Sequence, residues 1–129
     1  MGHEPIPPED EELAKRVIGA AIEVHRTLGP GFLERVSEEA LRYELTEALV
    51  PFERQKRLFV PYKKIVIHGH RIDLLVGDRI ILELKCVDDF SPIHQAQLIS
   101  CLKATGLRLG RLINFKVILL KDGIKRIVL

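Results

Sequence analysis

The segment Gly69–Lys85, GHRIDLLVGDRIILELK, has the residue pattern of a β-hairpin. Two runs rich in Val, Ile and Leu flank Gly77-Asp78, a dipeptide typical of tight turns. Because this connection is short, the two strands must be antiparallel neighbours in one sheet. Three charged residues, Asp73, Glu83 and Lys85, interrupt stretches that otherwise consist of core-forming side chains. Burying a charge without a partner is costly, so the hairpin constrains function as well as fold.

The length of the hairpin loop decides whether the charged side chains meet. With a two-residue turn, Asp73 faces Leu82 and Glu83 points to the other side of the sheet. With a three-residue loop at 77–79, Asp73 lies directly opposite Glu83, and Lys85 projects from the same face. Both registers are compatible with the sequence.

Two carboxylates that lie close together repel each other, so one takes up a proton or a cation sits between them. A hard divalent ion such as Mg²⁺ prefers carboxylate and water oxygens. Bound there, it would polarise a phosphate and lower the pKa of a coordinated water, while Lys85 would hold or help activate that water. This constellation is typical of phosphodiester hydrolysis. The alternative is a structural ladder of ion pairs on an exposed sheet face.

Helical patterns lie on both sides of this β-rich centre. Apolar residues at a period of 3.6 predict two N-terminal helices, and Ser91-Pro92 is typical of the start of a third. The predicted helices span Glu11–Leu28, Phe32–Leu49 and Ser91–Gly106. The predicted strands span Arg57–Val60, Tyr62–Ile67, His70–Val76, Ile80–Val87 and Leu109–Phe115, followed by a closing hairpin of Ile118–Leu120 with Ile124–Leu129. This order predicts an α/β fold with a mixed sheet flanked by helices.

The 129 residues predict one domain over 13–129, preceded by a flexible tail over 1–12 that is rich in Pro and acidic residues. No apolar run reaches the roughly 18 residues of a membrane span, and the tail lacks the apolar core of a secretory signal. Cys86 and Cys101 lack metal-type CxxC spacing and suggest reduced thiols in a cytoplasmic protein, with a disulfide as the alternative.

Charge is unevenly distributed along the chain. Residues 1–50 hold 11 acidic and 5 basic residues, whereas 51–129 hold 7 acidic and 15 basic residues. The basic excess of the second part is compatible with a surface that follows phosphates, and equally with an ordinary solvated surface.

Several motifs resemble one family. Asp73, nine residues and then Glu83-Leu84-Lys85 resemble the D…(D/E)xK signature of the PD-(D/E)XK nuclease superfamily. The segment Gly31–Leu41, GFLERVSEEAL, looks like the motif of the GxxExxY protein family, a small prokaryotic branch of that superfamily. Further similar segments are Arg71–Val76, Pro92–Leu98, Ala104–Gly106 and Leu112–Phe115. The resemblance covers roughly 13–128 and implies a restriction-endonuclease-like αβββαβ core with an extra N-terminal helix.

By position, the resemblance implies Asp73 and Glu83 as metal ligands, Glu34 as an extra acidic ligand and Lys85 as the catalytic lysine. Gln97 would border the active site. It also implies Mg²⁺ or Mn²⁺ as cofactor and DNA or RNA as partner. Without the resemblance, Glu34 reads as an ordinary exposed helix residue.

The sequence departs from the family pattern at two tyrosines. Ser37 stands at the motif tyrosine, and Cys101 stands where a QxxxY pattern would place the second. His94, Gln97 and Cys101 share one stripe of the third predicted helix because they are three and then four residues apart. His94 would contact phosphate or a partner subunit, or be a hydrogen-bonded helix histidine.

These observations predict a divalent-metal-dependent nuclease that hydrolyses nucleic-acid phosphodiester bonds. Because the two tyrosines are absent, the alternative is a catalytically weak or inactive nucleic-acid-binding or assembly module of the same fold. A homodimer that pairs through exposed strands or the third helix is compatible with either hypothesis.

Overall fold

The computed structural model describes residues 4–129 and shows an α/β fold. The elements in chain order are α1 (Pro8–Leu28), α2 (Glu34–Glu47), β1 (Phe52–Tyr62), β2 (Ile65–Val76), β3 (Ile80–Lys85), α3 (Pro92–Thr105), β4 (Leu109–Asn114), the 3₁₀ helix η1 (Leu120–Gly123) and β5 (Ile124–Val128). The strands form one sheet in the order β1-β2-β3-β4-β5. The pair β3 and β4 is parallel because α3 connects them, and the other neighbours are antiparallel.

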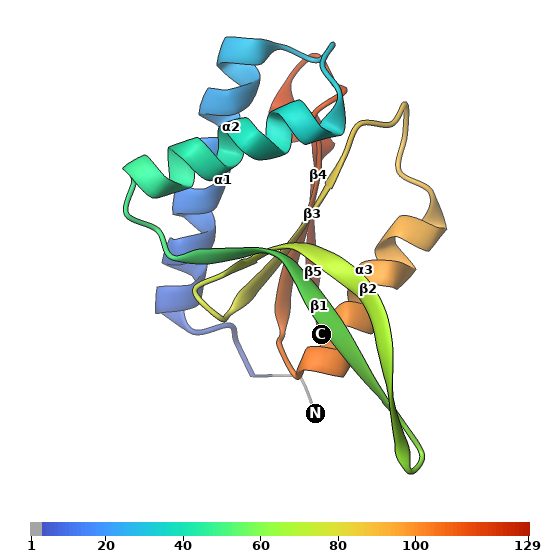
Figure 1. Ribbon diagram of the computed structural model, residues 1–129. Helices are drawn as coiled ribbons and strands as arrows, with labels where there is room; N and C mark the ends of the chain where they lie inside the picture. Colours follow the sequence, from blue (N-terminus) through green and yellow to red (C-terminus); the bar gives the residue numbers. More distant parts are fainter. Residues whose placement is uncertain (1–3) are drawn as a thin grey trace.

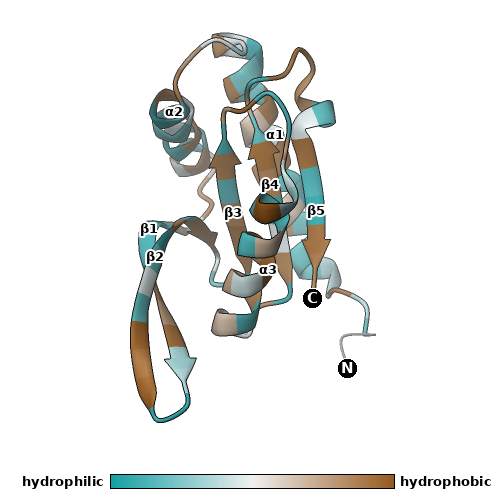
Figure 2. Ribbon diagram, turned by 90° about the vertical axis from the view of Figure 1, so that its right-hand side faces the viewer, coloured by the Kyte–Doolittle hydropathy of each residue, from teal (hydrophilic) through white to brown (hydrophobic). Residues whose placement is uncertain are grey.

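The helices lie on both faces of the sheet, with α1 and α2 on one side and α3 on the other (Figure 1). On the first side, Val17 and Leu45 from the helices pack with Leu82 from β3. On the second side, Leu98 from α3 packs with Ile81. Strand β3 is therefore covered on both faces, and Figure 2 shows β3 and β4 as largely apolar strands in the centre. The predicted mixed sheet flanked by helices is confirmed, and the arrangement is consistent with a restriction-endonuclease-like core.

Helix α1 begins at Pro8, before the predicted start at Glu11, so the part of the predicted flexible tail after residue 7 is helical. Proline is tolerated in the first helical turn, and the acidic residues there complement the helix dipole. Asp10 also pairs with Arg79 in the hairpin loop. Residues 1–3 of the predicted tail lie outside the described residues. The single domain over 13–129 stays a prediction.

Strands β1 and β2 form one long hairpin that turns at 63–64, so the predicted turns at Pro61 and His68-Gly69 are wrong. Pro61 pairs with Val66 inside the hairpin, which is possible because β1 is an edge strand and needs no inward N–H there. Gly69 lies against Leu58 and Val60 of β1, and a Cβ atom there would contact them at 3.3–3.4 Å. The hairpin reaches beyond the body of the molecule (Figure 1).

The predicted closing hairpin of Ile118–Leu120 with Ile124–Leu129 is also wrong. Leu120–Gly123 forms η1, and β5 pairs with β4 instead. A Cβ atom at Gly123 would lie 2.3 Å from the Asn114 carbonyl oxygen, so only glycine fits where η1 folds back against β4. Helices α2 and α3 lie within the predicted ranges. Among the described helices, none is both long and apolar enough to cross a membrane.

Shortening a buried side chain of β3 should measure how much the core on the two faces of the sheet contributes to stability. We expect Leu82→Ala to lower the free energy of unfolding by about 2–5 kcal/mol, because the fully buried Leu82 side chain would leave a cavity. Leu49→Ala is the matched control, since Leu49 is 86% exposed, and should change stability by less than about 0.5 kcal/mol. Urea unfolding followed by circular dichroism would measure both. Equal losses in the two variants would contradict a core centred on β3.

Candidate active site

The hairpin loop between β2 and β3 brings Asp73 and Glu83 together. Val76 pairs with Ile80, so three residues form the loop and the two-residue alternative is wrong. Gly77 and Asp78 both have positive φ angles, which glycine adopts freely and aspartate tolerates. Continued beyond the last ladder pair, Leu74 with Leu82, this register places Asp73 opposite Glu83.

Strand β2 separates from β3 beyond the pair Leu74 and Leu82. The β2–β3 ladder ends at Leu74 and Leu82, although β3 continues to Lys85. The Leu84 backbone N–H, which no longer has a strand partner on that side, donates to Asp73 Oδ2 at 2.8 Å. The Asp73 carboxylate therefore replaces a ladder bond, and the gap between the diverging strands is open to other groups.

The end of β3 is fixed on its other side by β4. Lys85 pairs with Asn114 in the parallel ladder, and the Phe115 N–H donates to the Lys85 carbonyl. The Asn114 side chain accepts from the Val87 N–H at 3.1 Å and donates to the Val87 carbonyl at 2.7 Å. These bonds hold the chain just after Lys85 and so position its side chain.

Helix α2 brings Glu34 to the site from its first residue. One turn further along α2, the buried Glu38 accepts from Gln55 Nε2 at 3.0 and 3.1 Å and from Arg54 at 3.3 Å. Arg54 also donates to Glu39 at 2.6 Å. This network ties the start of α2 to β1 beside the divergence of β2, and it explains the fixed position of the partly buried Glu34.

Helix α3 provides the opposite wall. The Ser91 N–H donates to His94 Nδ1 at 3.1 Å at the start of α3, so the neutral ring carries its proton on Nε2. Gln97 follows one turn later and is exposed. Cys101, another turn along, is fully buried, and its Sγ lies 3.2 Å from His70 Nε2.

All four residues predicted to act in catalysis, together with Glu34, line one pocket of about 320 Å³. The complete lining is Glu34, His70, Arg71, Asp73, Glu83, Lys85, His94 and Gln97. A larger cavity of about 440 Å³ lies between α1 and η1, but its lining is mostly apolar and contains no carboxylate. Another of about 390 Å³ lies beside the start of α1, and its carboxylates, Glu9 and Glu12, are exposed. The polar pocket is therefore the candidate site.

The pocket is not an exposed ladder of ion pairs. Glu83 is only 9% exposed, and within residues 4–129 no salt bridge joins Lys85 to a carboxylate. Glu83 Oε1 is buried and has no hydrogen-bond partner among the described residues. A buried carboxylate oxygen without a partner is energetically costly, which is typical of a site that binds a ligand.

The electrostatics of the pocket follow from this burial. Burial and the neighbouring Asp73 carboxylate raise the pKa of Glu83 to about 9. Burial and Asp73 also raise the pKa of Glu34, although Lys85 opposes the shift. Burial, with smaller contributions from Glu83 and Asp73, raises the pKa of the Cys101 thiol to about 11. The site thus concentrates acidic groups where water cannot stabilise their charges, and a cation would relieve this repulsion.

Two lining residues, His70 and Arg71, were not predicted as site residues from the sequence. Both precede Asp73 on β2, in the part of the strand that no longer pairs with β3. Their closeness to Asp73 in the sequence is the one feature that could have suggested them as site residues. Cys86 packs against the core on the α1 side, and both cysteines are free thiols, so the alternative of a disulfide is wrong.

The stability of the metal-free protein should fall as pH rises. Because Glu83 has a pKa of about 9 in the folded state, the folded protein keeps a proton that the unfolded chain releases near its ordinary value of 4.5. Between these values the unfolded state binds fewer protons, and stability declines by up to about 1.4 kcal/mol per pH unit.

Urea unfolding in EDTA at several values between about pH 6 and about pH 8.5 would measure this decline. We expect Glu83→Gln to remove most of it, whereas Glu47→Gln, an exposed glutamate at the end of α2, should retain it. A Glu83→Gln protein with the same pH dependence as the original chain would contradict the assignment.

Comparison with known proteins adds one finding to this geometry. Residues 11–127 match the family described as the PD-(D/E)XK nuclease superfamily, which covers nearly the whole chain and all of the pocket residues. A search of curated proteins and a search of solved structures each found no match.

Proposed function

The chain belongs to the PD-(D/E)XK nuclease superfamily, and from this premise we propose that its pocket hydrolyses nucleic-acid phosphodiester bonds with the help of a divalent metal ion. One observation carries the proposal: the buried, unpartnered Glu83 oxygen lies next to Asp73 in an open pocket that also contains a lysine. An aliphatic residue would fill this position in a purely structural strand without the cost of burying a carboxyl group, whereas a hydrolytic site can use that group.

The chemical types of the pocket's acidic side chains suit Mg²⁺ or Mn²⁺. Glu34, Asp73 and Glu83 would hold the ion, since they offer only oxygen ligands from three separate elements. When bound, such an ion polarises a phosphate oxygen and lowers the pKa of a coordinated water. It would also keep Glu83 ionised, because its charge opposes the burial that raises the pKa of this carboxyl.

The remaining polar groups have roles that follow from their positions. Lys85 forms no salt bridge with any residue in 4–129, so its ammonium group is available to orient the attacking water and balance phosphate charge. His94 lines the pocket with a ring whose Nε2 can donate, and Gln97 lies one turn further along the same wall. Both would donate hydrogen bonds to the substrate.

Within the superfamily, we place the chain in the GxxExxY branch. The support is Gly31 followed by Glu34 at the required spacing, with Glu34 at the pocket. The tyrosine position of this motif is Ser37, which is only 1% exposed and does not line the pocket. Its replacement therefore changes packing under α2 rather than a substrate contact.

Nucleic acid is the proposed partner because basic side chains lie beside the pocket. Arg71 lines it, and the β1–β2 hairpin that continues from Arg71 carries further cations. These are Lys56, Arg57, Lys63 and Lys64. A hairpin that reaches beyond the body with such charges suits contacts with successive phosphates (Figure 1).

Loss of cleavage in pocket variants would test the proposed activity. We expect the protein to cut plasmid or oligonucleotide substrates in Mg²⁺, and we expect Asp73→Ala and Lys85→Met to lower the rate by about 10²–10⁴-fold. Lys121→Met is the matched control, since Lys121 lies in η1 outside the pocket, and should retain the rate. Calorimetry that detects no Mg²⁺ binding at millimolar concentration would count against the proposal.

Substrate affinity separates catalysis from the alternative of an inactive binding module. Both hypotheses predict that affinity for nucleic acid falls steeply with added salt, because phosphate contacts release counterions. If the pocket uses a metal ion, Asp73→Asn should weaken binding in Mg²⁺. If it does not, Asp73→Asn should leave affinity unchanged or improve it, because a negative charge near phosphate is removed. Fluorescence anisotropy with a labelled oligonucleotide, with and without Mg²⁺, would distinguish these outcomes.

Two further expectations accompany the proposal. A homodimer is supported by apolar side chains at the hairpin tip that are more than two-fifths exposed, among them Phe59, Tyr62 and Ile65. A second copy pairing there would cover them, and the mass in solution would decide the question. A cytoplasmic location is supported by the two free thiols.

A further inference from the structure

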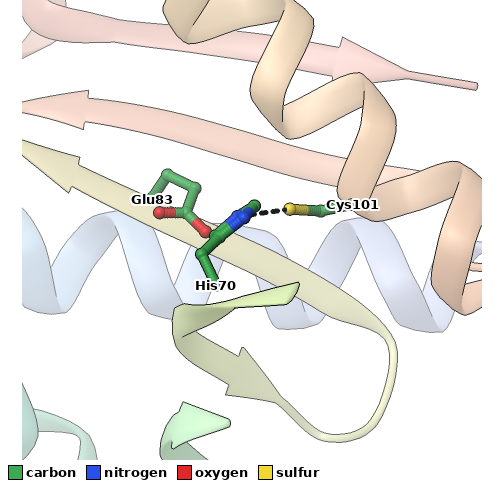
Figure 3. A group of neighbouring side chains, drawn as sticks. All are labelled: His70, Glu83 and Cys101. Atoms are coloured by element: carbon green, nitrogen blue, oxygen red, sulfur yellow. Dashed lines mark hydrogen bonds between the residues drawn. The ribbon is translucent and has the colours of Figure 1, made fainter. Parts of the chain in front are cut away.

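A second group of metal-binding side chains lies at the inner end of the pocket. One donor atom each from His70, Glu83 and Cys101 lies within 4.8 Å of the other two (Figure 3). The three residues come from β2, β3 and α3, so the packing of α3 on the sheet brings them together. Among the described residues, no other group of histidine, cysteine and carboxylate side chains is this compact.

The donor set differs in kind from the three carboxylates described above. It offers an imidazole nitrogen, a thiolate sulfur and a carboxylate oxygen, the combination that Zn²⁺ accepts and that Mg²⁺ does not. Two such ligands around a tetrahedral Zn²⁺ lie roughly 3.6 Å apart. The separation of His70 Nε2 and Cys101 Sγ is 3.2 Å, which is close to this value.

Independent support comes from Glu83. This residue is 9% exposed, and its Oε1 atom has no hydrogen-bond partner within residues 4–129. Figure 3 shows its carboxylate close to the His70 ring, beside the His70–Cys101 contact. An ion between the three groups would place a positive charge beside this buried carboxylate. His70 is exposed, so the ion would enter from solvent on the pocket side.

We propose that His70, Glu83 and Cys101 form a second metal site that is selective for a borderline-soft ion such as Zn²⁺, with water as the fourth ligand. The thiol proton of Cys101 and any proton on Glu83 are released to solvent when the ion binds, so that both residues bind it in their ionised forms. Because Glu83 also belongs to the carboxylate site, the two ions compete for it. The existence of the Zn²⁺ site stands independently of the proposed nuclease activity, whereas any inhibition by Zn²⁺ rests on that activity.

Cobalt spectroscopy of the full chain tests the site directly. Co²⁺ replaces Zn²⁺ at such sites, and a bound thiolate gives a near-ultraviolet charge-transfer band. We expect this band to appear with one equivalent of Co²⁺ in reducing, metal-free buffer, and to disappear when Zn²⁺ is added. Cys101→Ser should abolish the band, whereas the matched variant Cys86→Ser should retain it, because Cys86 packs against the α1 side of the sheet.

Substitution of the buried Cys101 could disturb the fold, so the exposed His70 provides a second test. We expect His70→Gln to weaken Co²⁺ affinity at least about tenfold, and His68→Gln, a hairpin histidine outside the pocket, to leave it unchanged. Circular dichroism would check that each variant is folded. No thiolate band in the original chain, a band retained in Cys101→Ser, or a band lost in Cys86→Ser would overturn the proposal.

Competition is measured without reference to activity. Titration calorimetry with Zn²⁺ should give a weaker apparent affinity as Mg²⁺ is raised, since both ions require Glu83. Zn²⁺ affinity that is independent of Mg²⁺ would overturn the shared-ligand part of the proposal. If the chain cleaves nucleic acid, Zn²⁺ should inhibit it at least about tenfold less in Cys101→Ser, relative to the activity of each protein without Zn²⁺. A chain without nuclease activity would still show the cobalt band.

Discussion

The pocket depends on the point at which strand β2 leaves strand β3. The ladder between them ends at Leu74 and Leu82, and the next N–H on that edge of β3, from Leu84, is taken up by the Asp73 carboxylate. The Asp73 side chain thus takes the place of a backbone carbonyl of β2 and satisfies the Leu84 N–H at the free edge of β3. This hydrogen bond also holds the Asp73 carboxylate at the pocket beside Glu83.

The divergence has an energetic consequence for β3, which is the most enclosed strand of the sheet. Alternate residues such as Leu82 and Leu84 pack under α1 and α2, while Ile81 packs under α3. Glu83 follows this alternation and is therefore driven toward the α3 side, where the apolar pattern would normally place another aliphatic residue. The packing around β3 holds the Glu83 carboxylate in a buried position, although hydration alone would favour its exposure to water. Because ionised Glu83 is poorly solvated there, a bound cation would stabilise it, and the pocket therefore favours cations.

Much of this arrangement could be predicted from the sequence because it depends on local rules. The spacing of Asp73 and Glu83, a three-residue loop and the alternation of a strand are sufficient to place both carboxylates on one face. The long β1–β2 hairpin was not predicted, since Pro61 and Gly69 resemble turn residues and are tolerated only through the edge position and the irregular register near Phe59. The contact between His70 and Cys101 depends on how far β2 twists beneath α3, which no local pattern encodes.

The two positions that lack the family tyrosines have different consequences because they lie in different places. Ser37 is a buried residue of α2 that does not line the pocket, so a smaller residue there changes the packing beneath α2 and leaves the chemical groups of the pocket unchanged. Cys101 does not itself line the pocket, but its sulfur lies 3.2 Å from His70 Nε2 and within 4.8 Å of a carboxylate oxygen of the buried Glu83. A phenol at that position would supply a hydrogen-bond donor to the carboxylate, whereas a thiol supplies a soft metal ligand. In the proposed scheme, the face of α3 that borders the hydrolytic site therefore also determines, through Cys101, which metal ions Glu83 can bind.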